Sequence, residues 1–384
     1  MNLDEIRKEI DITDSKLLEL FARRMELCRN VAQYKKENGM PVFQGSREKQ
    51  VLDKIAAQSP NELEGASRLL FSQIMEISKC LQQEQLTEYK ETEFSQLKKD
   101  PKNTTVACPG IRGSYSEEAC IKAFGENSHI NYYDTFDKVF EAVNSGKADY
   151  GVLPIENSTA GSVEGTYKLL ERYEMHLCGR LSIPVNHVLA AKSKDIPIEK
   201  VISHEQALHQ CSDFLKEKGY KQGAAKNTSI AAKTVADSSE NIACLCSAHC
   251  ARLYGLEILA ENIVDIGENF TRFVVISKEM QVEEGSDIIS LCLSLPHISG
   301  SLYKLLTKFY FSGLNLTKIE SRPMPPHIKK KSGSDCFEVI FYLDFEGSLS
   351  NPSVSKLLQN LKEDCGYYRL LGSYKDIGDI KENK

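Results

Sequence analysis

Residues 3–38 carry the apolar period of one long helix. Apolar side chains recur there at steps of three and four residues: Ile6, Ile10, Leu17, Leu20, Phe21, Leu27 and Val31. Gly39 and Pro41 mark its end, and two more helices are predicted at 47–58 and 66–89. The long helix would measure roughly 50 Å, whereas a compact segment of about 90 residues has a radius of gyration near 12 Å. We therefore expect it to pair with a second copy of the chain, in a homo-oligomer that is a dimer or a tetramer.

A different pattern begins at Thr104, where short β-rich runs alternate with helical stretches as far as residue 282. Such alternation predicts a largely parallel sheet. The segment is long enough for two α/β lobes with a cleft between them, a fold similar to that of periplasmic binding proteins. The polar stretch before it, at 91–103, is predicted to be a linker.

The last segment, 287–378, has the order strand, helix, strand, strand, helix, strand. This order predicts an α+β domain with the ferredoxin-like arrangement. With 384 residues the chain exceeds the size of a single hydrophobic core. We therefore expect a multidomain protein, with an all-α domain at 1–90, the linker at 91–103, the α/β domain at 104–282 and the α+β domain at 287–378.

The composition of the chain excludes several functional classes. A net charge of -6 gives no general electrostatic reason to bind nucleic acid or an anionic membrane. The start of the chain is charged from its fourth residue and no apolar run reaches 18 residues, so we predict a cytoplasmic protein without membrane partners. The 12 cysteines lie scattered among apolar neighbours, which predicts reduced, buried thiols.

The stretch PIENSTAGSV, at 154–163, places several short polar side chains after an apparent strand. A surface turn explains this composition. A ligand site also explains it, because open α/β sheets bind small molecules at the carboxyl ends of their strands. The composition of the stretch alone leaves both interpretations open.

Two groups of metal-binding residue types have the wrong spacing for a site. His204 and His209 are five residues apart, whereas two-histidine zinc ligation on a helix needs four. Cys244 and Cys246 alternate along an apparent strand and have no second cysteine pair at zinc-ribbon spacing. We predict no metal and no cofactor.

The first helix carries cations on one face. Arg24 and Lys35 are eleven residues apart, which places them within roughly 20° of each other and about 16 Å apart along the axis. A compact dianion fits between them. Arg7 is turned by roughly 100° and lies about 25 Å from Arg24. It can therefore reach the same ligand only from an antiparallel partner.

Residues 3–85 resemble the all-helical chorismate mutase domain in IRKEIDITDSKLLELFARRMEL, YKKENGMPVF, SREKQVL and EISKCLQQ. The resemblance implies an intertwined dimer whose site contains Arg7 of the second chain, Arg24, Lys35, Gln44, Arg47, Glu48, Ser78 and Gln82. A Claisen rearrangement needs a dicarboxylate held in a reactive chair and a donor to the ether oxygen. Lys35 and Gln82 would face that oxygen. The family usually has Asp where this chain has Gln44, so we expect altered affinity there.

The middle segment resembles the prephenate dehydratase domain in ACPGIRGSYSEEA, PIENSTAGSV, SHEQALHQCSDFL, LYGLEIL and ENFTRFVVI. The resemblance implies the catalytic and substrate-binding residues Glu156, Asn157, Thr159, Ser203, Gln210, Thr271, Arg272 and Phe273. Thr271 would be the acid, but a threonine hydroxyl is too weak an acid to act alone. We expect it to act within a hydrogen-bonded set that includes Glu156 and Asn157. Arg272 is either a carboxylate anchor or one half of an ion pair between the lobes.

Residues 288–378 resemble the ACT regulatory domain, with Glu320, Ser321, Arg322 and Pro323 in one motif and Gly300, Ser301 and Leu302 in the other. Tyr303 replaces the valine that usually ends the second motif. The resemblance implies phenylalanine as an allosteric ligand of paired domains. The three segments together resemble the bifunctional chorismate mutase/prephenate dehydratase family, acting on chorismate and prephenate. Two alternatives remain, an arogenate-preferring dehydratase and a non-catalytic amino-acid sensor.

Overall fold

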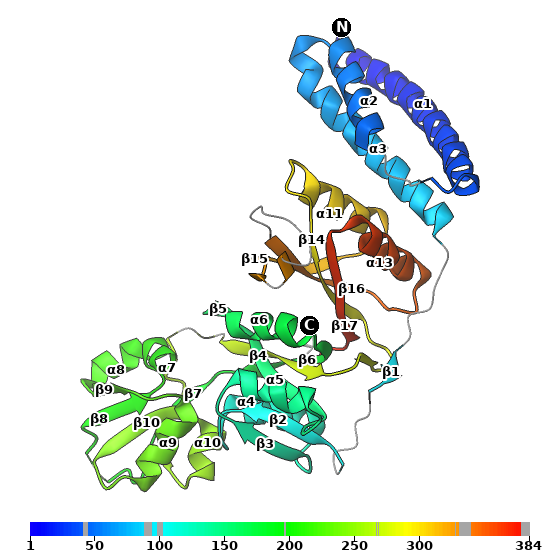
Figure 1. Cartoon of the computed structure of the whole chain (residues 1–384). Helices are drawn as coiled ribbons and strands as arrows, with labels where there is room; N and C mark the ends of the chain where they lie inside the picture. The colour runs from blue at the N-terminus through cyan, green and yellow to red at the C-terminus, as the bar shows by residue number, and fades with distance from the viewer. Residues whose placement is uncertain are drawn as a thin grey trace. The chain divides into compact units, whose positions relative to one another are not determined.

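The computed structural model describes residues 1–40, 45–87, 94–97, 103–195, 197–265, 267, 269–326, 328–329 and 339–377. The chain divides into two compact units. One combines 1–92 with 291–370 and the other combines 93–290 with 371–384. The parts are coloured and labelled in Figure 1, and each unit is described by itself.

Three helices form the N-terminal part of the first unit: α1 (Leu3–Glu37), α2 (Gly45–Gln58) and α3 (Glu64–Leu86), with a short 3-10 turn (Asn61–Leu63) before α3. A capping box starts α1, because the Asn2 side chain accepts from the Glu5 backbone N–H and the Glu5 carboxylate accepts from the Asn2 N–H. Helix α3 packs against both α1 and α2. Along its 35 residues α1 buries only Met25, Ala32 and Lys35.

The second unit contains two sheets. The first has the order β3 (His129–Tyr133), β2 (Thr105–Pro109), β4 (Tyr150–Asn157), β12 (Phe270–Ser277), β6 (His176–Pro184), with β5 (Gly161–Ser162) beside β4. Its helices are α4 (Tyr115–Phe124), α5 (Phe136–Asn144) and α6 (Glu164–Tyr173). The second has the order β11 (Glu257–Ala260), β7 (His187–Ala191), β10 (Ile242–Ser247), β8 (Lys200–Ser203), β9 (Lys221–Ala224). Its helices are α7 (Glu205–Gln210), α8 (Ser212–Lys218), α9 (Thr228–Asp237) and α10 (Ala248–Leu253). Each sheet with its helices forms one lobe (Figure 1).

The expectation of a largely parallel sheet is wrong for both lobes. Strand β2 pairs in parallel with β3 and β4, but β12 is antiparallel to β4 and β6. In the second lobe β8 is parallel to β9 and β10, but β7 is antiparallel to β10 and β11. The physical reason is the path of the chain. It leaves the first lobe after β6 and returns as β12, and a strand that re-enters from the other lobe is free to run against its neighbours.

A third sheet contains β14 (Ile288–Ser294), β15 (Leu316–Pro323), β16 (Val339–Glu346) and β17 (Tyr367–Tyr374), in the order β15-β16-β14-β17. Helix α11 (Ser301–Phe311) follows β14, and α13 (Pro352–Asp364) follows β16. This is the predicted βαββαβ order. In the polar stretch predicted as a linker, β1 (Ser95–Gln96) pairs with β13 (Gln281–Val282). None of the helices in the described ranges is long and apolar enough to cross a membrane.

Candidate active sites

A cavity of about 530 Å³ lies between the lobes of the second unit. Pro109 at the end of β2 and Asn157 at the end of β4 contribute to its wall. Thr271 and Phe273 of β12 and Gln210 of α7 line it as well. The volume suits a small organic acid. The polar stretch at 154–163 thus reaches a ligand-sized cavity at the carboxyl end of a strand, where open α/β sheets bind ligands.

The N-termini of α4 and α9 lie at this cavity. Ser114 caps α4 and Asn227 caps α9, each accepting a backbone N–H in the first turn. Both caps line the cavity, as does Gly110, which has a φ of 98° and lies beside both of them. Free backbone N–H groups and the helix dipole make such termini favourable for carboxylates. Lys226, next to Asn227, adds a cation to the wall.

Asn157 organises the polar groups at the end of β4 and is only 8% exposed. Its Oδ1 accepts from the backbone N–H of Thr159 at 3.2 Å and of Ala160 at 3.0 Å. Its Nδ2 donates toward the Phe270 carbonyl at 3.1 Å and the Thr271 hydroxyl at 2.9 Å. The register of the sheet pairs Asn157 with Thr271 directly. The two residues, separated by most of the domain in sequence, therefore act as one group.

Thr271 has a hydroxyl hydrogen that is free to point into the cavity. Its Oγ1 already accepts from Asn157, and among the described residues no acceptor for the Thr271 hydroxyl hydrogen is found. The hydroxyl is therefore a donor toward a ligand.

Glu156 and Arg272 do not line this cavity, contrary to expectation. They are paired across β4 and β12 and form an ion pair of 2.7 Å within one sheet. Neighbouring residues of a strand point to opposite faces of the sheet. Because Asn157 and Thr271 point to the face at the cavity, Glu156 and Arg272 point to the other face. The interlobe ion pair considered for Arg272 is likewise replaced by a pair within the first lobe.

Two other expected residues differ in position. Ser203 is fully buried at the end of β8, and its hydroxyl donates to the Leu245 carbonyl at 2.7 Å, so it is not part of the cavity wall. Thr159 lines an adjacent hollow, which Gln210 also lines. Gln210 donates to the Thr159 hydroxyl at 2.9 Å and so connects the two spaces.

The sequence interpretation missed His187 and Tyr115, which both line the cavity. His187 is 3% exposed, and burial lowers its pKa to about 4 despite a hydrogen bond to Gln210 that acts in the opposite direction. Burial raises the pKa of Tyr115 well above its usual range. His187 starts β7 in an unremarkable stretch, IPVNHVLAA, and no local pattern marks it.

A second cluster lies among α1, α2 and α3. Lys35 is 9% exposed, Ser78 4% and Gln82 6%. Gln82 Nε2 donates to Ser78 Oγ at 3.1 Å, while Gln82 Oε1 is buried with no hydrogen-bond partner among the described residues. Arg24 lies on the same face of α1 as Lys35, with its guanidinium 3.9 Å from the Cys28 sulfur. Unpaired buried amide oxygens are rare in proteins, which points to a ligand donor at this position.

Burial lowers the pKa of Lys35, while Cys28 and Glu48 act to raise it. Glu48 therefore lies near Lys35, but its carboxylate also contacts Lys79 at 3.1 Å. The single chain does not bring Arg7 to this cluster, because Arg7 is exposed and 3.7 Å from Asp4. Arg47 is exposed on α2, and Gln44 lies outside the described residues.

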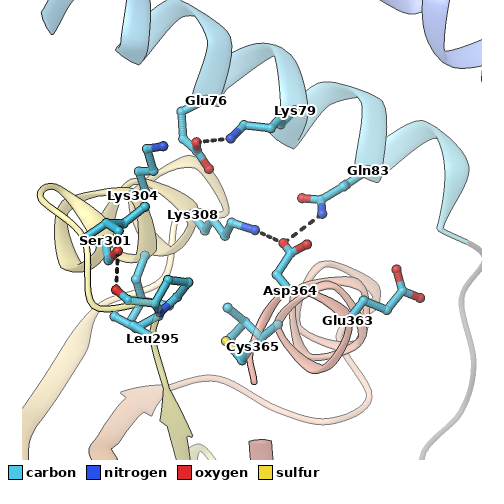
Figure 2. A pocket seen from close by; sticks show the side chains of 14 residues that line it. Glu76, Lys79, Gln83, Leu295, Ser301, Lys304, Lys308, Glu363, Asp364 and Cys365 are labelled. Atoms are coloured by element: carbon cyan, nitrogen blue, oxygen red, sulfur yellow. Dashed lines mark hydrogen bonds and ion pairs between the residues drawn. The ribbon is translucent and has the colours of Figure 1, made fainter. Parts of the chain in front are cut away.

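A further cavity of about 430 Å³ lies within the first unit, between α3 and the helices α11 and α13 (Figure 2). Lys79 contacts Glu76 at 2.6 Å, and Lys308 pairs with Asp364. Gln83 donates to the same Asp364 carboxylate at 3.0 Å. The helix that carries Ser78 and Gln82 thus also contacts the C-terminal domain.

The residues expected to bind phenylalanine are divided between two places. Ser301 lines the cavity of Figure 2 and follows Gly300, which has a φ of 84°; Leu302 comes next on α11. Glu320, Ser321, Arg322 and Pro323 end β15, where Glu320 pairs with Arg322 at 2.6 Å. The second group does not line that cavity.

Two families match the chain along the segments just described. The family Chorismate mutase type II matches residues 6–83, and Prephenate dehydratase matches residues 106–281. The N-terminal helices and the two-lobed unit are therefore a chorismate mutase and a prephenate dehydratase joined in one polypeptide.

Curated relatives and solved structures agree with both segments. The bifunctional chorismate mutase/prephenate dehydratase of Aquifex aeolicus is 34% identical over 380 residues, covering 97% of each chain. The arogenate dehydratase/prephenate dehydratase 2 of Arabidopsis thaliana is 38% identical over 276 residues, covering 70% of this chain and 72% of the relative. A prephenate dehydratase from Arthrobacter aurescens in complex with L-Phe superposes with a TM-score of 0.62 at 26% identity, covering 71% and 90%.

The chain belongs to the bifunctional chorismate mutase/prephenate dehydratase family. It is an enzyme of phenylalanine biosynthesis with both activities. This finding favours catalysis over the amino-acid sensor considered from the sequence.

Proposed function

We propose that chorismate rearranges to prephenate at the cluster of Arg24, Lys35, Ser78 and Gln82. Support comes from two long-chain cations on one helical face and from the polar side chains of α3 opposite them. In the rearrangement one C–O bond breaks and one C–C bond forms, with no proton transferred. The protein must hold the two carboxylates and donate to the ether oxygen. Arg24 fits the first task, while Lys35 and the Gln82 amide fit the second.

The mutase site requires a second copy of the chain, which supplies Arg7. Large apolar side chains remain exposed on α1 along its whole length: Leu3, Ile6, Ile10, Ile12, Leu17, Leu18, Leu20, Leu27 and Val31. A stripe of this length is covered by the same helix of a partner, which also places Arg7 opposite Arg24.

We predict that Leu20→Glu, at a position 68% exposed in the single chain, disrupts the oligomer and lowers mutase activity. A charge in the apolar interface is costly to bury. Sedimentation velocity would measure the mass, with Lys16→Glu on the same helix as the control. A wild-type chain that sediments as a monomer with full mutase activity would contradict the pairing.

Prephenate loses its ring carboxylate and ring hydroxyl at the interlobe cavity. The C–C bond to the carboxylate breaks, the carboxylate leaves as carbon dioxide, and the electron pair of that bond completes the aromatic ring. The C–O bond breaks at the same time, and the leaving hydroxide takes a proton to become water. Thr271 is the donor to that oxygen. The N-termini of α4 and α9 and Lys226 hold the carboxylates.

Phenylalanine regulates the enzyme through the C-terminal domain at 287–378, which we assign to the ACT type on its strand order and its two motifs. The separation of the motifs within one chain supports a site completed by a second ACT domain. The other functional domains are the mutase at 1–90 and the dehydratase at 104–282, joined by 91–103. The enzyme acts in the cytoplasm.

One feature of the cavity favours arogenate as a second substrate. Asp134 lines the wall close to Lys226 and forms an ion pair with Lys138 at 3.0 Å. The hydrogen bond from Lys138 and the charges of Lys138 and Lys226 lower the pKa of Asp134. An ionised carboxylate pairs with the ammonium group that arogenate carries in place of the keto group of prephenate.

Chorismate added to the purified enzyme is expected to yield phenylpyruvate. The absorbance of phenylpyruvate in alkali would measure its formation. Saturating phenylalanine is expected to lower the rate. Arogenate supplied in a separate reaction would yield phenylalanine if the Asp134 carboxylate binds the ammonium group of arogenate. Accumulation of prephenate without phenylpyruvate would refute the assignment of the dehydratase site, and an unchanged rate with phenylalanine bound would refute the regulation.

A further inference from the structure

Six polar side chains of the second unit form one unbroken series of hydrogen bonds that ends at Thr271, and all of them except Thr159 line the cavity. The series runs through Tyr115, His187, Gln210, Thr159, Asn157 and Thr271. The five hydrogen bonds between consecutive members have donor-to-acceptor distances of 3.1, 3.3, 2.9, 2.7 and 2.9 Å, in the order of the series. Only the last two members were expected in one hydrogen-bonded set from the sequence.

The direction of the hydrogen bonds is fixed at Asn157 by the backbone. Its Oδ1 faces two backbone N–H groups, of Thr159 and Ala160, and its Nδ2 faces the Phe270 carbonyl. A reversed side-chain amide would place N–H against N–H and oxygen against oxygen. Asn157 therefore donates to Thr271 and does not accept from it.

The direction then propagates outward to His187. The Thr159 hydroxyl donates to Asn157 Oδ1, so it must accept from Gln210 Nε2. The Gln210 Oε1 then faces His187 Nε2, which must carry a hydrogen. In a neutral imidazole the other nitrogen, Nδ1, is an acceptor. It faces the Tyr115 hydroxyl at 3.1 Å and shares the hydrogen of that hydroxyl with the Asn186 carbonyl, which lies 3.0 Å from the same oxygen.

Burial of His187 and Tyr115 maintains this direction of the hydrogen bonds near neutral pH. It lowers the pKa of His187 to about 4, so the ring is neutral and carries one hydrogen. It raises the pKa of Tyr115 well above its usual range, so the phenol keeps its proton. Hydrogen bonds that run in one direction through groups that both donate and accept polarise one another.

We propose that Tyr115 and His187 are positioning residues that orient and polarise the Thr271 hydroxyl, so that its hydrogen points at the departing oxygen of the substrate. The inference rests on the donor role proposed above for Thr271. It answers the difficulty that an isolated threonine hydroxyl is a poor acid. In this proposal Tyr115 and His187 act on the reaction through Gln210, Thr159 and Asn157.

The series also crosses between the lobes. Tyr115, Thr159, Asn157 and Thr271 belong to the first lobe, whereas His187 and Gln210 belong to the second. The hydrogen bonds are complete only when the lobes adopt this arrangement. The donor is therefore set by the same arrangement that encloses the substrate.

A double-mutant cycle tests the inference in the full-length enzyme. His187→Phe removes both ring nitrogens, and we expect kcat for prephenate to fall at least about tenfold, part of the hundredfold or more that a general acid contributes. KM should change little, because the carboxylates are held elsewhere. In a Thr271→Ala background, His187→Phe should cause no further loss, because it acts only through that hydroxyl. Tyr115→Phe should give a smaller loss with the same dependence on Thr271.

The matched control is His209→Phe, because His209 is an exposed histidine of α7 outside the series. This variant should leave kcat unchanged. An equal fold-loss from His187→Phe in both backgrounds would overturn the inference, as would normal turnover in both His187→Phe and Tyr115→Phe. If His187→Phe fails to fold, the Tyr115→Phe cycle decides alone, since it removes a single oxygen. Normal turnover in Thr271→Ala alone would refute the donor role proposed for Thr271. That result differs from the equal fold-losses in both backgrounds, which would refute only the positioning role of His187 and Tyr115.

Discussion

Replacing Thr271 by valine should lower prephenate dehydratase turnover at least about a hundredfold, the usual effect of losing one donor to a developing negative charge. Valine keeps the shape of threonine and replaces the hydroxyl by a methyl group, so the pairing of β12 with β4 should persist. Steady-state rates of phenylpyruvate formation would measure the loss. The mutase activity of the same sample should be unchanged, because residues 6–83 contain the other catalytic segment.

Thr271→Ser is the matched control for this prediction. It restores the hydroxyl and removes one methyl group, so most of the turnover should return. Asn157 would still donate to the serine oxygen and leave the hydroxyl hydrogen for the substrate. Turnover near normal in Thr271→Val would remove Thr271 from the mechanism, and poor turnover in both variants would indicate that the methyl group and packing matter more than the donor.

The helices of the mutase domain were predictable because their signal is local. The three- and four-residue period of α1 and the stop at Gly39 depend only on neighbouring residues, and the structure ends the helix at Glu37. The mixed direction of both sheets was not predictable in the same way. It depends on which lobe the chain enters after β6, and no local pattern near Pro184 encodes that choice.

Part of the geometry of the dehydratase site is predictable from the alternation of side chains along its strands. Glu156 and Asn157 are adjacent on β4, as Thr271 and Arg272 are on β12, so only one of each pair can face the cavity. Alternation alone excludes the four acting together. His187 illustrates the opposite case, because its role depends on contacts with Tyr115 and Gln210, which are 72 and 23 residues away.

Replacing Lys35 by methionine should lower chorismate mutase turnover by about two to three orders of magnitude, because it removes a buried donor to the ether oxygen. Methionine keeps an unbranched chain of similar length and lacks the ammonium group, with its charge and its hydrogen-bond donors. Lys36→Met is the matched control, since Lys36 occupies the next position of the same helix turn and is exposed. Following chorismate consumption would measure both, with the dehydratase rate of each variant as an internal reference.

The pH dependence of the mutase provides a second readout of the same side chain. Burial lowers the pKa of Lys35, so the ammonium loses its proton at a lower pH than an exposed lysine does. Activity that depends on the charged form should be present at neutral pH and disappear as the pH rises through that lowered value. Lys35→Met should abolish this alkaline decline along with most of the rate, whereas Lys36→Met should retain it. If the alkaline decline survives in Lys35→Met, another titrating group carries the charge at the ether oxygen, and the role proposed for Lys35 is wrong.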